Sequence, residues 1–314
     1  MCGGAGFFGT NLVARLSELP EIDVVGTYFS KLPSASLTNT KFRRVDLADF
    51  QQTLDITADF DVVVMAAVMS PVTTDIGRSA VLSNAYNIKM VSNVGQACDI
   101  NRVGKLIWLS SATVYQQIFG IASELDLDLN AKPARPTEQV GWYYRYAEQI
   151  LLSNGALTHT QLCILRVSSM YGPHDNFSNT ATVVPALLKK ALSHPDKLFV
   201  RGDGKAARDF VFVSDVVAVV EEFINNCFED RCVVNVGSGR TTSIRELVIS
   251  IIGLLGVNMP VEFEFDSDQS AMTRSIDITK LDQLTDGLRK TELLAGLAKT
   301  MSWYQAVKEA GGVK

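Results

Sequence analysis

Apolar residues in the first half of this chain fall alternately into short continuous runs and into sets with helical spacing. The runs have the length and composition of strands buried on both faces of a sheet, as in the DVVVMAA segment at residues 61–67. The predicted strands are residues 23–28, 41–45, 61–67, 105–110 and 161–166, and the predicted helices are residues 10–19 and 85–98. This alternation favours a doubly wound parallel α/β sheet.

The pattern changes after about residue 167. A polar loop at residues 173–176 precedes a predicted helix at 183–192, and Ser243 with Glu246 has the spacing of a capping box before an amphipathic helix. We therefore expect a Rossmann-like dinucleotide-binding domain over residues 1–167. A smaller, mainly substrate-binding α/β lobe is expected over residues 168–314, from which residues near 205–236 return to the core.

A glycine-rich loop opens the chain. Gly3, Gly6 and Gly9 permit a tight turn, close backbone approach to a pyrophosphate, and close packing of the following helix. Amides at the helix start, around Phe7 and Phe8, would bind the phosphates with help from the helix dipole. Only two residues precede Gly3, so the strand that should lead into this loop is missing. We expect a gap in the sheet there or, preferably, a natural start several residues upstream.

Polar or small residues follow several of the predicted strands. Asp46 and Leu47 come after the strand at 41–45, where a carboxylate would meet an adenine amino group. Ala66 and Ala67 end the next strand, with side chains small enough for a dinucleotide to lie across them. Open α/β sheets bind ligands at the carboxyl ends of their parallel strands, so these residues predict a binding site.

Composition narrows the class of protein. The 314 residues suffice for one large domain or two closely packed ones, and a net charge of −5 with a pI near 5.3 favours neither nucleic acid nor an anionic membrane surface as partner. The longest apolar run, residues 62–69, is far below the ~20 residues that span a bilayer, and no secretion signal opens the chain. Five cysteines without a CxxC pair predict buried thiols in a cytoplasmic protein. Three scattered histidines predict no metal site.

Five motifs, in order along the whole chain, resemble those of one enzyme family. Residues 2–9, 110–116, 171–177, 202–215 and 235–247 match TGGxGFxG, SSxxVYG, YGPxDNF, GDGxxxRDFxxVxD and NxGSGxxxSIxEL. Cys2 replaces the first Thr, and Gln116 replaces the Gly of the second motif. The chain thus resembles the extended short-chain dehydrogenase/reductases of the NAD-dependent epimerase/dehydratase type, which act on nucleotide sugars.

The segment from Asp175 to Phe177, with the Val-Pro-Ala-Leu that follows, is most similar to the GDP-fucose synthase branch of that family. The resemblance implies epimerisation and reduction of a GDP-4-keto-6-deoxy sugar. It also implies a homodimer, formed through a four-helix contact that would use helices near residues 85–100 and 142–153.

The resemblance implies catalysis by a Ser, a Tyr and a Lys, the last two as YxxxK on one helical face. The Lys would lower the pKa of the Tyr from ~10, so that the phenol exchanges a proton near neutrality. Ser111 matches the serine of this set. Alignment on residues 145–148, however, places Val140 at the Tyr position and Tyr144 at the Lys position.

Three interpretations of this substitution stay open. Tyr143 or Tyr144 supplies the phenol, with Arg145 as a fixed positive charge, although Arg replaces Lys poorly. The alignment is displaced by a residue or two. Otherwise hydride transfer is absent or severely slowed, and the chain is a nucleotide-sugar-binding pseudoenzyme whose tyrosines only pack or line the cleft.

The end of the strand at 23–28 bears on the cofactor. An NAD-preferring site has an Asp or Glu there for the ribose 2′-hydroxyl. Ser30 and Lys31 occupy this place and would receive a 2′-phosphate, which favours NADP over NAD, although Lys31 also suits a solvated loop. Val167 and Ser169 follow the strand at 161–166 and are also expected in the cofactor site, because open α/β sheets bind ligands at such strand ends.

Candidates for substrate binding come from the second half of the chain. Arg208 and Arg274 match family positions that contact a sugar-nucleotide diphosphate, and two guanidiniums would make bidentate contacts to it. Asn176 and Lys189 are further candidates, although a solvated helix face is the simpler interpretation of Lys189.

Overall fold

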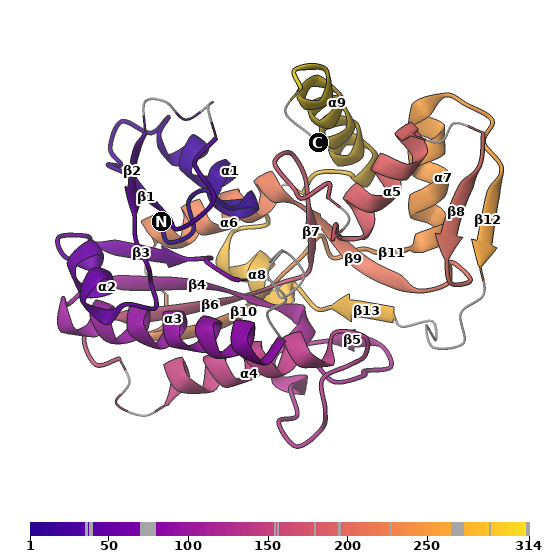
Figure 1. Cartoon of the computed structure of the whole chain (residues 1–314). Coiled ribbons are helices and arrows are strands. Elements are labelled where there is room, and N and C mark those ends of the chain that lie inside the picture. Colours follow the sequence, from indigo (N-terminus) through magenta and orange to yellow (C-terminus); the bar gives the residue numbers. More distant parts are fainter. Residues whose placement is uncertain are drawn as a thin grey trace.

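The computed structural model describes the chain apart from a few short segments. The described residues are 1–34, 37, 40–69, 80–153, 155, 157–178, 180–193, 196–226, 228–264, 273–288 and 290–311. Two layers of helices enclose a central sheet, and a second α/β lobe lies at one end of that sheet (Figure 1).

The central sheet is parallel throughout. Four strands pair in the order β10-β6-β4-β3, namely Arg231–Val236, Gln161–Val167, Lys105–Ser111 and Val62–Met65. Beside them, β1 (Val25–Tyr28) pairs in parallel with β2 (Lys41–Arg44). Most side chains of the inner strands are buried, as expected for strands covered on both faces. This architecture confirms the predicted doubly wound fold.

The first two residues close the sheet between β1 and β3. Cys2 N donates to Val64 O at 2.8 Å, and Ala66 N donates to Cys2 O at 3.1 Å. On the other side, the Met1 amino group donates to Val25 O at 2.8 Å, and Thr27 N donates to Met1 O. The expected gap in the sheet is therefore wrong, because two residues suffice to bond both neighbouring strands.

Helices cover both faces of this sheet (Figure 1). On one face, α1 (Phe7–Leu16) and α6 (Val213–Asn225) bury residues such as Leu12 and Val220. The other face is covered by α2 (Phe50–Thr57), α3 (Ala80–Ile100) and α4 (Glu138–Leu152), which contribute residues such as Val94 and Leu151. The apolar stripes of these helices supply the core that holds the strand ends in place.

The second lobe contains a small sheet with strand order β11-β9-β13-β5. These strands are Thr241–Ser243, Ala207–Phe212, Thr273–Ile276 and Ile121–Ala122, and β7 (Ser169–Tyr171) also pairs with β9. A separate pair joins β8 (Leu198–Arg201) to β12 (Val261–Glu264). The remaining helices are α5 (Val183–Ser193), α7 (Ile244–Leu255), α8 (Thr279–Leu284) and α9 (Leu293–Glu309), and two 3₁₀ turns lie at Ala112–Val114 and Glu124–Asp126.

Element boundaries differ from the predicted ones most at the starts of two helices, and α3 begins at Ala80 rather than residue 85. Helix α1 begins at Phe7 rather than residue 10, because Gly6 is already its N-cap. The capping box of α7 is confirmed, since Ser243 accepts from Glu246 N at 3.1 Å and Ser243 N donates to the Glu246 carboxylate at 2.7 Å. Cys2, Cys98, Cys163 and Cys232 are buried free thiols, and Cys227 lies outside the described residues. In the part of the chain that is described, no helix combines the length and hydropathy needed to cross a bilayer.

Candidate nucleotide-binding cleft

The glycine-rich loop approaches its neighbours so closely that side chains would not fit. Gly3 has a φ of 84°, and a Cβ on it would lie 2.8 Å from the Ala67 backbone. A Cβ on Gly9 would lie only 2.1 Å from Gly3 O, so helix α1 packs directly on the loop. The predicted reason for glycine at these two positions is thus met by the geometry.

The N-terminus of α1 is available to an anion. Its N-cap, Gly6, provides no capping side chain, and its first turn contains no acidic residue. The side chain of Phe8 is buried and that of Phe7 partly buried in the core, so only the backbone amides of these residues face the loop. Unpaired amides at a helix N-terminus, reinforced by the helix dipole, are a site for phosphate.

The remaining cofactor candidates lie along the strand ends next to this loop. The backbone of Ala66 and Ala67 adjoins Gly3. Asp46 accepts from Ala48 N at 2.9 Å and from the Tyr86 hydroxyl, so its carboxylate is held at the end of β2. Leu47 is buried in the core, and its carbonyl accepts from Asn93 and Thr53. Ser30 and Lys31 are exposed just beyond β1.

A cavity of about 230 Å³ lies where the central sheet meets the second lobe. Its lining includes residues predicted for catalysis, for cofactor binding and for substrate binding. These are Ser111 for catalysis, Val167 and Ser169 for the cofactor, and Arg208 and Arg274 for the substrate. The other lining residues are Ala112, Thr113, Thr137, Ser168, Met170, Thr182, Val183, Val184, Asp209, Phe210 and Ile276. The cavity approaches the size of small-ligand sites and combines an apolar wall with a few polar groups.

Two partly buried arginines give this cavity its charge. Arg208 on β9 and Arg274 on β13 are register partners in adjacent parallel strands. Burial and the neighbouring Arg208 lower the pKa of Arg274 to about 10, and burial lowers the pKa of Arg208. Arg274 donates to the Thr137 hydroxyl, and among the described residues no carboxylate forms an ion pair with either guanidinium. A diphosphate would supply the missing negative charge.

The carboxylate of Asp209, which also lines the cavity, already accepts several hydrogen bonds from neighbouring residues. Its oxygens accept from the Ser168 hydroxyl, from the Ser238 amide and hydroxyl, and from Gly239 N, at 2.8–3.0 Å. Burial raises its pKa above the ordinary value. Asp209 therefore fixes the loop that follows β10 rather than neutralising the arginines.

The tyrosines proposed for catalysis do not reach the cavity. Tyr143 is 3% exposed and packs in the core, while Tyr144 packs against Trp108 at a ring distance of 6.0 Å. Burial raises the pKa of Tyr144 to about 12 and that of Tyr143 well above its usual value. Proton exchange near neutrality requires the opposite change. Neither phenol is activated in this arrangement.

The guanidinium of Arg145 donates mainly to backbone oxygens. It is 2% exposed and donates to Val114 O, to Ala131 O and to the Gln116 side chain. Ser111 does line the cavity, where its hydroxyl oxygen accepts from Thr113 N and the Thr113 hydroxyl. Ser111 therefore lines the cavity, whereas Tyr143, Tyr144 and Arg145 are not among its lining residues.

Asn176 and Lys189 also lie outside the cavity lining. Asn176 donates to the Thr180 hydroxyl and accepts from Ser178 N, and Lys189 donates to Phe177 O at 2.8 Å. These bonds fasten the loop after β7. Whether this loop contacts a substrate stays a prediction.

Sequence reasoning missed one unusual carboxyl in the same loop. Asp175 accepts from Asn176 N with one oxygen, while its other oxygen is buried and has no hydrogen-bond partner among the described residues. Burial raises the pKa of Asp175 to about 7. It also missed Thr137, whose position just before a helix was the available signal.

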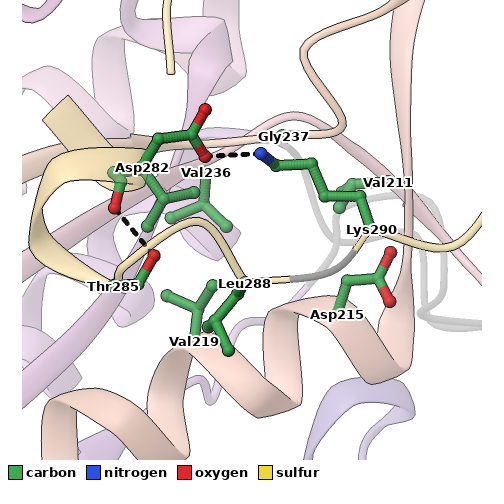
Figure 2. A pocket seen from close by; sticks show the side chains of 10 residues that line it. Val211, Asp215, Val219, Val236, Gly237, Asp282, Thr285, Leu288 and Lys290 are labelled. Atoms are coloured by element: carbon green, nitrogen blue, oxygen red, sulfur yellow. Dashed lines mark hydrogen bonds and ion pairs between the residues drawn. The ribbon is translucent and has the colours of Figure 1, made fainter. Parts of the chain in front are cut away.

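A second cavity, of only about 10 Å³, lies between α6 and α8 (Figure 2). It offers room for about one water molecule. Lys290 and Asp282 form an ion pair across it at 2.5 Å, and the Asp215 carboxylate accepts from Thr291. These contacts attach the segment before α9 to the central domain and do not form a ligand site.

The fold is that of a Rossmann-like α/β protein, with a glycine-rich loop at the strand ends and an adjoining cavity that contains two arginines. Residues 1–237 match the NAD dependent epimerase/dehydratase family, and the chain belongs to this family. The family predicted from the sequence motifs is thereby confirmed.

Curated relatives of the chain differ in what their names say they do. It is 27% identical over 323 residues to a UDP-N-acetyl-alpha-D-glucosaminuronate decarboxylase of Bacillus cytotoxicus, covering 98% of this chain and 97% of that protein. It is 28% identical over 233 residues to the GDP-L-fucose synthase of Escherichia coli, covering 69% and 72%. Among solved structures, MoeE5 in complex with UDP-glucuronic acid and NAD has a TM-score of 0.81 at 24% identity, over 97% of this chain and 98% of that one. This last likeness supports the fold alone.

Proposed function

We propose that this chain binds a nicotinamide dinucleotide and a nucleotide sugar in one cleft, and that its hydride-transfer chemistry is absent or severely slowed. One observation supports the proposal. The cavity combines Ser111 with an unneutralised arginine pair, whereas the helix that should supply the Tyr and Lys has Val140 and Tyr144 at those positions.

The residues around the glycine-rich loop fit a dinucleotide. Gly3 and Gly9 let the loop pack against Ala67 and helix α1 at distances that a Cβ would prevent, and the amides at the start of α1 would bind the pyrophosphate. When bound, the nicotinamide would donate or accept hydride. For this cofactor we propose NADP rather than NAD, because no Asp or Glu occurs from residue 24 to 45 while Ser30 and Lys31 are exposed at the end of β1.

For the substrate we propose a diphosphate-linked sugar held by Arg208 and Arg274. The guanidinium pair recognises the diphosphate, which UDP- and GDP-sugars share, so the arginines do not select the base. A GDP-sugar is favoured by the resemblance of residues 171–177 to the GDP-fucose synthase branch.

A second candidate function follows from the same resemblance. An active epimerase and reductase would act on a GDP-4-keto sugar despite the altered helix, and the GDP-L-fucose synthase of Escherichia coli is among the relatives. This candidate needs another proton donor or acceptor than the phenols of Tyr143 and Tyr144, because the pKa of each is raised.

Calorimetry and a single-turnover assay test both candidates. Titrations with NADPH, NADH, GDP-mannose and UDP-glucose measure binding, and nicotinamide absorbance after addition of a 4-keto sugar nucleotide measures turnover. We expect binding without turnover in the natural chain and a gain of turnover in the Val140→Tyr/Tyr144→Lys variant. Comparable turnover in both chains would establish the second candidate, and failure to bind any nucleotide would refute both.

We also propose that the chain forms a homodimer in solution. On the outer face of α4, Trp142 and Tyr146 are 42% and 56% exposed, which is unusual for large aromatic side chains of a monomer.

A further inference from the structure

Residues 116–131, between β4 and α4, form a loop that presents large apolar side chains to solvent. Phe119 is 97% and Leu125 96% exposed, and Ile121 and Leu129 are exposed as well. A single exposed apolar side chain needs no explanation. Four of them between residues 119 and 129 concentrate exposed apolar surface in one loop, as is typical of an interaction site.

The loop is held in place by hydrogen bonds from buried or partly buried groups. Gln116 donates to Asp126 O at 2.6 Å and accepts from Asp128 N at 3.1 Å, which closes the loop on itself. The guanidinium of Arg166, at the end of β6, donates to Glu124 O at 3.0 Å. Within the loop, β5 pairs with β13 of the second lobe. Because the loop is already ordered, a partner that docks on it would lose little conformational entropy in fixing it.

Trp142 lies next to both ends of this loop. Its ring is 5.2 Å from the guanidinium carbon of Arg145, which donates to Val114 O at one end of the loop and to Ala131 O at the other. We call Phe119, Ile121, Leu125, Leu129 and Trp142 the loop surface. Figure 1 shows the loop projecting beside β5, close to the start of α4.

Charges around the loop surface are of both signs and are separated. Glu124, Asp126 and Asp128 lie within residues 116–131, which contain no Lys or Arg. Lys132 and Arg135 follow directly; the side chain of Arg135 is 87% exposed and also lies 3.7 Å from the Glu138 carboxylate of its own chain. In a two-fold symmetric contact each surface meets its own copy, so the acidic loop of one protomer can face the basic segment of the other.

We infer that the loop surface docks against the loop surface of a second copy of this chain. Apolar side chains would form the centre of the contact, and the acidic and basic segments would pair at its edge. This inference rests on the proposed homodimer for the presence of a second copy, and it assigns a contact beyond the outer faces of α3 and α4.

Sedimentation velocity over a concentration series of the full chain tests this assignment. Phe119→Ser/Leu125→Ser removes the two most exposed members of the surface, and both side chains are too exposed for their loss to disturb folding. Leu32→Ser/Phe199→Ser is the matched control, since these apolar side chains are 71% and 48% exposed elsewhere. We expect the dimer dissociation constant to rise roughly tenfold or more in the first variant only, with an unchanged Tm. Added salt should weaken the natural dimer.

Two results would overturn the inference: a natural chain that is monomeric throughout the series, or a dimer that the loop variant leaves as tight as the control does. A Tyr146→Ser variant separates the two contacts. If it alone dissociates the dimer, the homodimer stands and the loop assignment fails. Nucleotide calorimetry is independent of all these variants, so a failure of the proposed ligand function would be recognised separately.

Discussion

Replacement of Arg274 by Met should stabilise the free protein and weaken its binding of nucleotide sugars. The pKa of Arg274 falls from 12.5 to about 10 because the guanidinium is buried and lies beside Arg208. A base whose pKa is lowered by folding destabilises the folded state wherever it is charged. The penalty is therefore complete below about pH 10 and is relieved only as the pH rises from there towards 12.5.

The magnitude at neutral pH follows from the two pKa values. The change from 12.5 to about 10 corresponds to ~3 kcal/mol. Removing the side chain also removes its hydrogen bond to the Thr137 hydroxyl, at a cost of ~1 kcal/mol. We expect a net gain of ~2 kcal/mol in the free energy of unfolding, measured by urea titration at pH 7.5 without ligand.

Ligand affinity should change in the opposite direction. A hydrogen bond to a charged group contributes ~1.5–3 kcal/mol, so the dissociation constant for UDP-glucose or GDP-mannose should rise roughly 10- to 150-fold in calorimetry. Arg240→Met is the control, because Arg240 is 71% exposed in its ion pair with Glu292 and should alter neither quantity much. A variant that is less stable than the natural chain and binds both nucleotides equally well would refute the reasoning.

Three further substitutions have defined outcomes. Asp175→Asn should raise the free energy of unfolding above pH 7 by about 4 kcal/mol and leave it nearly unchanged near pH 4. Burial raises the pKa of Asp175 from 3.8 to about 7, so its ionisation over that interval destabilises the fold. Urea titrations at the two pH values test this, and equal effects at both would contradict it. Gly9→Ala should lower the free energy of unfolding by ~2 kcal/mol and abolish NADPH binding, since its Cβ would lie 2.1 Å from Gly3 O. An unchanged calorimetric affinity for NADPH would refute the role of this loop in phosphate binding. Lys105→Met should lower the free energy of unfolding by ~2–3 kcal/mol, because the buried ammonium donates to Phe223 O and Asn226 O at the end of α6. Nucleotide affinity should not change. A thermal or urea midpoint equal to that of the natural chain would show that water replaces the Lys105 ammonium.

The order of elements could be predicted from sequence because each depends on local pattern. The continuous apolar runs gave β4 and β6 nearly to the residue, since both strands are buried on both faces and need no polar alternation. Ser243 and Glu246 defined the start of α7, because a capping box involves only residues three apart. The closure of the sheet by Met1 and Cys2 could not be predicted, because it depends on bonds to strands 24 and more residues away.

The candidate site was harder to predict from the sequence, because it too depends on contacts between residues far apart in the chain. Motif position identified residues that the fold brings to one cavity, among them Ser111 and Arg208. It could not show that the ring of Tyr144 packs against Trp108, because that depends on how α4 lies against β4. Nor could it show that Arg145 is used to hold a loop rather than to carry charge into the cleft.

The energetics of the two halves of the cleft favour binding over proton transfer. Arg208 and Arg274 are partly buried without a counter-ion among the described residues, and the lowered pKa of each means that the free protein loses stability by keeping them charged. Only an anionic ligand in the cavity would recover that free energy. Val140 and Tyr144 offer no comparable stabilisation to a transition state. Val140 is apolar, and the pKa of the Tyr144 phenol is raised to about 12, so neither side chain would be stabilised by the charge changes of a hydride-transfer reaction. A chain arranged in this way should therefore show its function as affinity for a diphosphate, and the opposite effects of Arg274→Met on stability and on affinity measure that property directly.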